Sequence, residues 1–88
     1  MVVSIEKLLQ KSFHPHFLQI QDDSEKHRLH KKSALTSGHY SVTLVSDLFQ
    51  GQSALERHRK VYEVLKEQDI HALGLKTYTV EEWRAKQN

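Results

Sequence analysis

The spacing of apolar residues predicts helices at both ends of the chain and a third between its strands. Residues 17–21 and 40–46 alternate apolar and polar side chains, as half-buried strands do. Residues 4–13 have helical spacing instead, with Ser4 as the N-cap. The turn His14–Pro15–His16 should end this helix, because proline disfavours helical backbone in the residue before it. The apolar face of the first helix comprises Ile5, Leu8, Leu9 and Phe13.

The second half of the chain carries two start signals for helices. Ser53 with Glu56, and Thr79 with Glu82, both follow the capping-box pattern, in which a glutamate lies three residues after a hydroxyl residue. Residues 70–78 between these helices are expected to form a third strand. The stripe expected to face the core on the central helix contains Leu55, His58, Val61, Tyr62 and Leu65.

The element order is therefore helix, strand, strand, helix, strand, helix, within a single domain over residues 1–88. Two strands joined by a loop favour antiparallel pairing, whereas a crossover through a helix favours parallel pairing. We expect an α+β fold in which a three-stranded mixed sheet has its helices packed on one face. Residues 22–38 lack periodicity, and a loop of that length is commonly functional or disordered.

Composition narrows the class of protein. The 88 residues carry a formal net charge of +2, seven histidines and no cysteine. Without cysteine, the chain cannot supply thiolates to a metal cluster by itself. No segment has the roughly 18 apolar residues that a membrane span needs, and no secretory signal is visible. We expect a soluble cytoplasmic protein with no membrane partner.

The motifs of common enzyme classes are missing from the sequence. It contains no Gly-x-Ser-x-Gly element, no cysteine nucleophile and no glycine loop for phosphates. We therefore expect no catalytic residue and no small-molecule substrate.

The basic run Arg57–His58–Arg59–Lys60 is a candidate nucleic-acid site. Successive helical residues are about 100° apart, so Arg57 and Arg59 should point to different sides. Phosphate contacts favour one continuous basic face, which weakens this interpretation. His58 falls on the apolar stripe and is expected to be half-buried.

Three histidines are candidate metal ligands. His27 and His30 lie three residues apart in the long loop, and His71 opens the third strand. Two or three imidazoles can bind a metal ion, although solvated surface histidines give the same pattern.

Several short segments, taken together, resemble the BolA-like proteins over nearly the whole chain, from about Ser4 to Trp83. They are Asp22–Asp23–Ser24 followed by His27, His39–Tyr40, Leu44–Val45–Ser46–Asp47, Phe49–x–Gly51, Arg57–His58–Arg59, and His71–Ala72–Leu73 leading to Lys76–Thr77–Tyr78–Thr79 with Trp83.

The resemblance implies a fold similar to class II KH domains, but without the Gly-x-x-Gly loop with which KH domains clamp RNA. It also implies a non-enzymatic adaptor that binds a monothiol glutaredoxin. The two proteins would share a 2Fe–2S cluster, for which the glutaredoxin supplies its cysteine and a bound glutathione. His71 corresponds to the family's invariant ligand, and His27 matches the histidine-type second ligand. His30 and His39 remain alternatives for that second ligand.

Some BolA-like proteins are described as DNA-binding transcriptional regulators in stress response and morphology. The resemblance makes this the alternative function, with DNA as the partner. The candidate contacts are Arg57, Arg59, Lys60 and Lys76. A third hypothesis is a stress-response scaffold that holds no metal.

Overall fold

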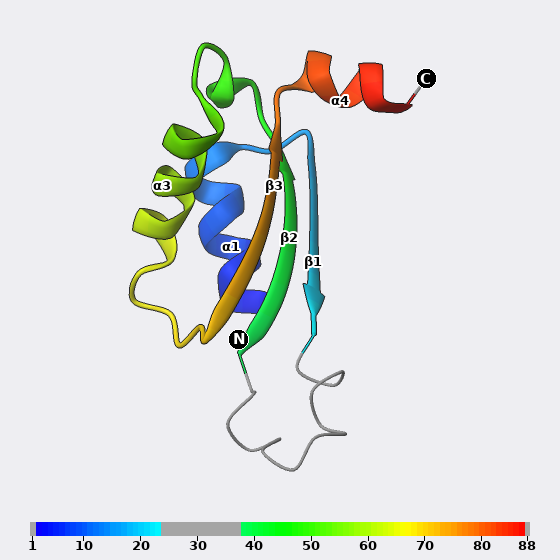
Figure 1. The fold of residues 1–88 in the computed structure, drawn as a ribbon. Helices are drawn as coiled ribbons and strands as arrows, with labels where there is room; N and C mark the ends of the chain where they lie inside the picture. The colour runs from blue at the N-terminus through cyan, green and yellow to red at the C-terminus, as the bar shows by residue number, and fades with distance from the viewer. Residues whose placement is uncertain (1, 24–37, 88) are drawn as a thin grey trace.

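The computed structural model describes residues 2–23 and 38–87. The elements follow the order expected from the sequence (Figure 1). They are α1 (Val2–Phe13), β1 (Phe17–Asp22), β2 (His39–Val45), the 3-10 helix η2 (Asp47–Phe49), α3 (Ala54–Leu65), β3 (Ala72–Tyr78) and α4 (Val80–Gln87).

The sheet has the predicted mixed topology. Its strand order is β1-β2-β3, with β1 antiparallel to β2 and β3 parallel to β2. Val42 lies at the centre, opposite Ile20 on one side and Leu75 on the other. The third strand begins at Ala72 rather than residue 70, because the backbone of Ile70 turns back to bond the carbonyl of Gln68.

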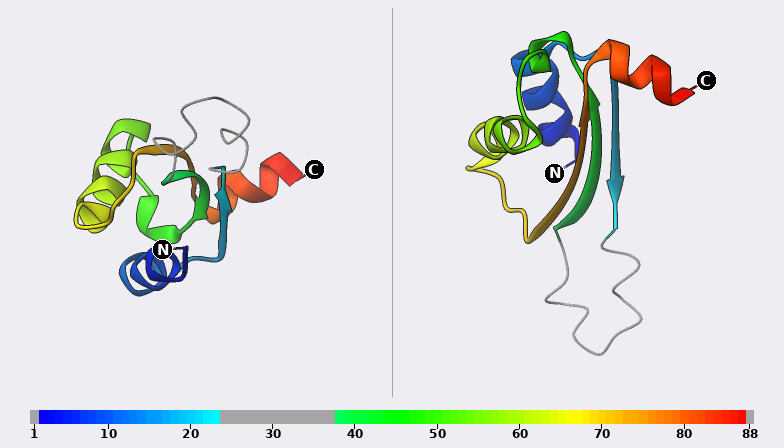
Figure 2. Two further views of the ribbon diagram at one scale, coloured as in Figure 1. Left: turned by 90° about the horizontal axis from the view of Figure 1, so that it is seen from below. Right: turned by 45° about the horizontal axis from the view of Figure 1, so that its top comes forward.

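Two helices cover one face of the sheet. Figures 1 and 2 show α1 and α3 side by side on the same face. Leu18 and Ile20 of β1 contact the core from the sheet side, as their alternation predicts. The core joins α1, β2, η2 and α3, and its buried residues are Ile5, Leu9, Phe13, Tyr40, Val42, Leu44, Phe49, Val61 and Leu65.

The first helix starts earlier than predicted. It begins at Val2, so Ser4 lies inside the helix and its assignment as N-cap is wrong. The side chain of Val2 packs against the core, which favours the additional helical residues. The helix ends at Phe13 as expected, and His14 follows in the left-handed region with φ 45°.

A buried serine joins the end of β2 to the first helix. Ser46 is fully buried, and its hydroxyl donates to the carbonyl of Phe13 over 2.7 Å. The same oxygen accepts from the backbone N–H of Leu48, which caps η2. The strand therefore ends where it can hold both α1 and η2.

The buried face of α3 differs from the predicted stripe. Val61 and Leu65 are buried as expected, but Leu55 and Tyr62 are 59% and 51% exposed. Arg57 takes the inward position one turn before Val61 and is only 8% exposed. The helix is rotated because Arg57 reaches from it to α4.

The last helix lies apart from the other two. Figure 2 shows α4 extending away from the side of the sheet that α1 and α3 cover. The ring of Trp83 stacks on Phe17, with centroids 5.0 Å apart, and contacts Tyr78 at 5.4 Å. Alternation along β1 and β3 puts Phe17 and Tyr78 on the face opposite the core. None of the described helices has the length and apolar character to cross a membrane.

Candidate functional site

Two histidine rings lie side by side where β2 and β3 begin. His39 is the first residue of β2, and His71 immediately precedes β3. Their ring centroids are 5.0 Å apart, and the ring planes are inclined by 35°. Because β2 and β3 are parallel, with His39 opposite Ala72, both strands start at the same end of the sheet. Parallel pairing therefore brings together two side chains 32 positions apart in the chain.

A glycine fixes the backbone at this pair. The carbonyl of Gly38 accepts from the N–H groups of His71 and Ala72, over 3.0 and 3.3 Å. Gly38 has φ +84°, and a Cβ there would come within 3.1 Å of the Asp69 carbonyl and the His71 nitrogen. A side chain at residue 38 would thus be strained and would also displace His71.

The histidine pair is open on one side. His39 is half-buried and His71 is exposed. A hollow of about 340 Å³ lies beside His71, between the end of α3 and the start of β3. Its lining combines the exposed ring of Tyr62 with polar and apolar side chains, including Leu65, Lys66, Ile70 and Leu73. The side chain of His71 is therefore exposed to solvent beside this hollow.

The same end of the sheet carries negative charge. Burial raises the pKa of the Tyr40 hydroxyl, and the carboxylates of Asp22 and Asp69 raise that pKa further. Tyr40 follows His39 in β2, and Asp69 lies two residues before His71. Both carboxylates are therefore close enough to Tyr40 to disfavour the negatively charged form of its hydroxyl.

The structure places only some of the predicted metal ligands. His27 and His30 fall outside the described residues, so their positions relative to His71 stay predictions. His39, one of the alternatives from the sequence, is the described histidine whose ring contacts that of His71. Within residues 2–23 and 38–87, no three His, Asp or Glu side chains are grouped so that they could hold a metal ion.

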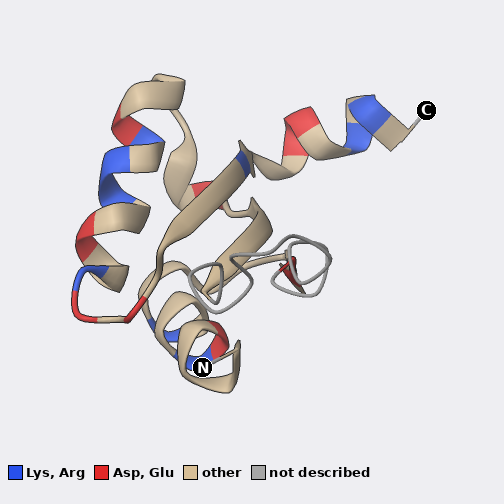
Figure 3. Ribbon diagram, turned by 60° about the horizontal axis from the view of Figure 1, so that its bottom comes forward, with Lys and Arg blue, Asp and Glu red and all other residues tan. Residues whose placement is uncertain are grey.

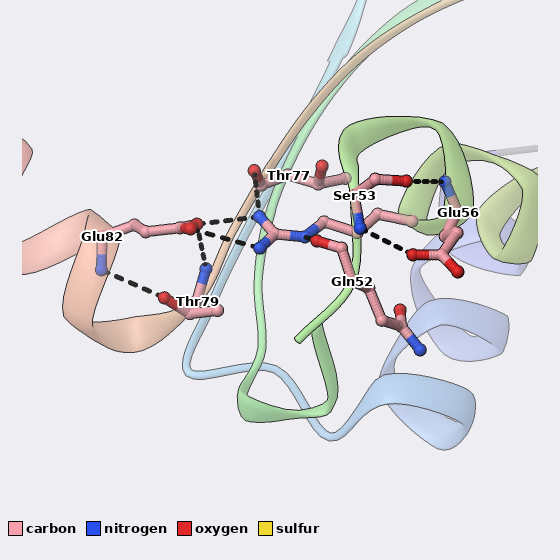
Figure 4. Close-up of polar contacts among 7 residues, drawn as sticks. Gln52, Ser53, Glu56, Thr77, Thr79 and Glu82 are labelled. Atoms are coloured by element: carbon pink, nitrogen blue, oxygen red, sulfur yellow. Dashed lines mark hydrogen bonds and ion pairs between the residues drawn. The ribbon is translucent and has the colours of Figure 1, made fainter. Parts of the chain in front are cut away.

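Arg57, a predicted nucleic-acid contact, is used inside the fold. Its guanidinium makes a bidentate pair with Glu82, over 2.8 and 3.1 Å (Figure 4). The same group donates to the carbonyls of Gln52 and Thr77 and lies 5.7 Å from the ring centre of Phe49. This is a correction to the basic-run hypothesis, because a buried guanidinium already bonded to Glu82 is not available to phosphates.

The carboxylate of Glu82 both pairs with Arg57 and caps the start of α4. It accepts from the backbone N–H of Thr79 over 2.8 Å, and the Thr79 hydroxyl accepts from the Glu82 N–H over 3.1 Å, which completes the predicted capping box. Hydrogen bonds from Arg57, and then from Thr79, lower the pKa of Glu82 to about 2. The sequence contained a signal for the inward position of Arg57, because Arg57, Val61 and Leu65 follow one another at four-residue spacing on one face of α3.

The other basic candidates do not form one surface. Arg59 and Lys60 are exposed on α3, which covers the core face of the sheet. Lys76 lines a hollow with Gln19, Gln21 and Thr43, on the opposite face. Figure 3 shows basic positions distributed over separate elements, with acidic positions between them on α3.

Known proteins are similar to this chain in sequence and in fold. The family model described as BolA-like protein matches residues 9–82. The chain is 41% identical over 87 residues to the Escherichia coli protein named DNA-binding transcriptional regulator BolA, covering 96% of this chain and 80% of that protein. It is 33% identical over 79 residues to SufE-like protein 1 of Arabidopsis thaliana, covering 81% of this chain and 21% of that protein.

Solved structures agree with these matches. BolA1 from Arabidopsis thaliana superposes with a TM-score of 0.82 at 32% identity, covering 93% of this chain and 94% of that one. BolA1 from Mus musculus gives a TM-score of 0.78 at 31% identity, covering 98% and 70%. The fold and site define a small α+β domain that presents two imidazoles at one end of a mixed sheet. The chain belongs to the BolA-like family.

Proposed function

We propose that this chain is a non-enzymatic cytoplasmic adaptor that binds a monothiol glutaredoxin. The two proteins would hold a bridging 2Fe–2S cluster, in iron–sulfur cluster trafficking or iron homeostasis. The observation that supports this proposal most directly is the pair of imidazoles at His39 and His71, whose ring centroids are 5.0 Å apart. The exposed side of His71 gives the partner a route to the cluster.

The side chains of the site fit half of a cluster. A 2Fe–2S cluster needs four protein or thiol ligands, and two imidazoles can replace two thiolates on one iron. The chain has no cysteine, so the other two ligands would be thiolates from the glutaredoxin and its glutathione. When bound, such a cluster supplies one-electron chemistry at a higher potential than an all-cysteine cluster. This chain would contribute the position of its imidazoles, whose nitrogen atoms take the place of two thiolates on one iron.

The second ligand is a separate part of the proposal. His71 is the first ligand, and the contact between the rings supports His39 as the second. The resemblance favours His27 instead, with His30 as a further alternative, and both lie outside the described residues. The three assignments differ in which single substitution removes the cluster from the mixed complex.

Visible absorption and circular dichroism of cluster-loaded glutaredoxin test the proposal. Adding the chain should change both spectra, and His71→Ala should abolish the change. His39→Ala, His27→Ala and His30→Ala identify the second ligand, with His58→Ala on α3 as the control. An unchanged spectrum with the native chain, or a full change with His71→Ala, would overturn the proposal. Loss with His27→Ala alone would overturn only the choice of His39.

DNA binding is the second candidate function. Three bacterial relatives carry the name DNA-binding transcriptional regulator BolA, from Escherichia coli, Haemophilus influenzae and Vibrio cholerae. With Arg57 used inside the fold, the exposed candidates are Arg59 and Lys60 on α3 and Lys76 on the sheet. Each phosphate neutralised should lower log K by about 0.9 per decade of salt.

A gel-shift series over salt concentration tests DNA binding. The double variant Arg59→Ala, Lys60→Ala should reduce the salt slope by about 2 if these two side chains contact phosphates. Lys76→Ala gives the matched comparison, because Lys76 lies on the other face of the sheet. Absence of retardation at low salt would eliminate this candidate.

A further inference from the structure

The face of the sheet opposite α1 and α3 holds a hollow of about 400 Å³. The strand register arranges its polar lining in two rows that cross all three strands. The rows are Gln21 with Ser41 and Gly74, and Gln19 with Thr43 and Lys76. The two amides and the ammonium group make no hydrogen bond or ion pair within residues 2–23 and 38–87, which leaves them available to a ligand.

Gly74 gives the hollow part of its depth. A Cβ at this position would meet only the Ser41 hydroxyl at 3.7 Å and the Tyr40 carbonyl at 3.9 Å, which are ordinary van der Waals contacts. The backbone of Gly74 is not in the left-handed region, where glycine is favoured. Glycine inside a strand costs stability and often marks a place where a ligand approaches closely. The fold therefore does not need glycine here, whereas an open hollow does.

An aromatic row closes one end of the hollow. Phe17, Val45 and Tyr78 form the next row along the strands, and Trp83 of α4 stacks on Phe17. Val45 is fully buried although the alternation turns it away from the core, because α4 packs over this end of the face. Phe17 stays 37% exposed. The hollow thus passes from a polar floor to aromatic rings.

Positive charge borders the same aromatic row. The Lys86 ammonium lies 5.8 Å from the ring centre of Tyr78, and Lys76 precedes Tyr78 by two residues on the same face of β3. At the other end of the hollow, the carboxylate of Asp23 accepts from the Ser41 hydroxyl. An anionic group is therefore favoured near the aromatic end.

This combination matches the chemistry of a single-stranded nucleic acid. Amides can bond the edges of unpaired bases, ammonium groups can neutralise phosphates, and exposed rings can stack on bases. Open sheet faces with aromatic side chains hold unpaired bases in other folds. A duplex fits less well, because its grooves admit a helix or a two-stranded ribbon rather than a flat sheet. Strands about 4.8 Å apart make the floor roughly 10 Å wide, which is enough for about two nucleotides.

We propose that this sheet face binds single-stranded nucleic acid. Lys76 and Lys86 contact phosphates, and the amides of Gln19 and Gln21 bond base edges. Phe17 offers its exposed ring to a base. An acidic peptide would match the ammonium groups but would leave the amides and the ring without base edges and base faces.

The proposed surface is separate from both candidate functions described above. It shares no side chain with the pair of His39 and His71, so it does not rest on the cluster adaptor. It also lies on the face opposite Arg59 and Lys60, the α3 candidates for duplex DNA.

Fluorescence anisotropy with short labelled oligonucleotides of mixed sequence tests the proposal. The native chain should bind the single strand, as DNA or RNA, at least tenfold more tightly than the duplex of the same sequence. A polyglutamate peptide of equal charge should displace the strand at least tenfold less well than the unlabelled strand does. No binding of either single strand at low salt, equal binding of the duplex, or equal displacement by the peptide would overturn the proposal.

Single variants locate the surface. Gly74→Val fills the hollow and should weaken binding at least tenfold while the far-ultraviolet circular dichroism stays native. Lys76→Ala, at an exposed position, should lower the salt slope by about 0.7 and keeps the test valid should the valine variant unfold. Lys60→Ala on α3 is the matched control and should leave binding unchanged.

Unaltered binding by Lys76→Ala, or an equal loss with Lys60→Ala, would overturn this assignment of the surface. The measurements contain no glutaredoxin, so their failure leaves the cluster proposal intact, and failure of the cluster spectra leaves the sheet-face proposal intact.

Discussion

At the end of the sheet where β3 leads into α4, a charged side chain is enclosed and bonded. At the end where β2 and β3 begin, two ionisable rings stand together beside an open hollow. Arg57 is 8% exposed and bonds Gln52, Thr77 and Glu82. His71 is exposed and has a second imidazole as its neighbour. The first end uses its charge to attach a helix, and the second leaves the imidazole of His71 exposed.

This difference explains why Arg57, although it lies in the most basic run of the sequence, serves the fold rather than the surface. A guanidinium can be buried when a carboxylate and backbone carbonyls take up its donors, and Arg57 meets that condition. Ligand chemistry instead needs side chains that remain reachable. The position of a residue in the fold therefore decides whether its charge serves stability or binding.

The largest expected effect is that of Arg57→Ala. Loss of the guanidinium removes the bidentate pair and leaves the carbonyls of Gln52 and Thr77 without their donor, so the free energy of unfolding should fall by about 3 kcal/mol. Urea denaturation measures this loss. Arg57→Lys keeps the charge but not the fork geometry and should lose an intermediate amount. A loss below about 0.5 kcal/mol would show that this end of the sheet is not held by the ion pair.

Gly38→Ala tests the opposite end. The substitution strains a backbone with φ +84° and pushes a Cβ against Asp69 and His71, so we expect a loss of about 2 kcal/mol. It should also weaken the change that the chain causes in the visible spectrum of cluster-loaded glutaredoxin, because His71 is displaced from His39. Gly51→Ala is the matched control, since Gly51 has φ +77° but nothing within 4 Å of its added Cβ. An equal spectral change with the two variants would contradict a role for Gly38 in positioning the pair.

The free energy of unfolding, measured as a function of acidic pH, tests the role of Glu82. Its folded pKa of about 2 lies below the ordinary value of 4.5, so its contribution is complete above about pH 4.5 and is lost as pH falls toward 2. Because its side chain is 48% exposed, solvent screens the pair and we expect only about 1 kcal/mol. Glu82→Gln should flatten this part of the curve. The difference from the native chain is the quantity to measure, since the pKa of Glu56 is also lowered. An identical curve would argue against the ion pair.

The smallest expected effect is that of Arg59→Ala. Arg59 is exposed, two positions from Arg57, so its removal should change the unfolding free energy by less than about 0.5 kcal/mol. Thermal unfolding monitored by circular dichroism compares the two arginine variants directly. A loss as large as that of Arg57→Ala would mean that the difference in burial between Arg57 and Arg59 does not determine their contributions to stability.

Much of the fold could be predicted because its signals are local. The element order, both capping boxes and the buried positions Ile5, Leu9 and Phe13 follow from spacing within a few residues. The boundaries depend on tertiary contacts, since Val2 extends α1 through a contact with the core rather than through a cap. The rotation of α3 was missed because amphipathic patterns treat arginine as an outward residue.

The sequence by itself determined the class of the fold, the family and the lack of thiolates, because these are properties of composition and short-range order. It also identified His71 as a ligand candidate through the resemblance. Only the tertiary structure decided that Arg57 faces inward and that the rings of His39 and His71 meet. Both facts depend on parallel β2–β3 pairing and on the docking of α4, which join residues far apart in the chain.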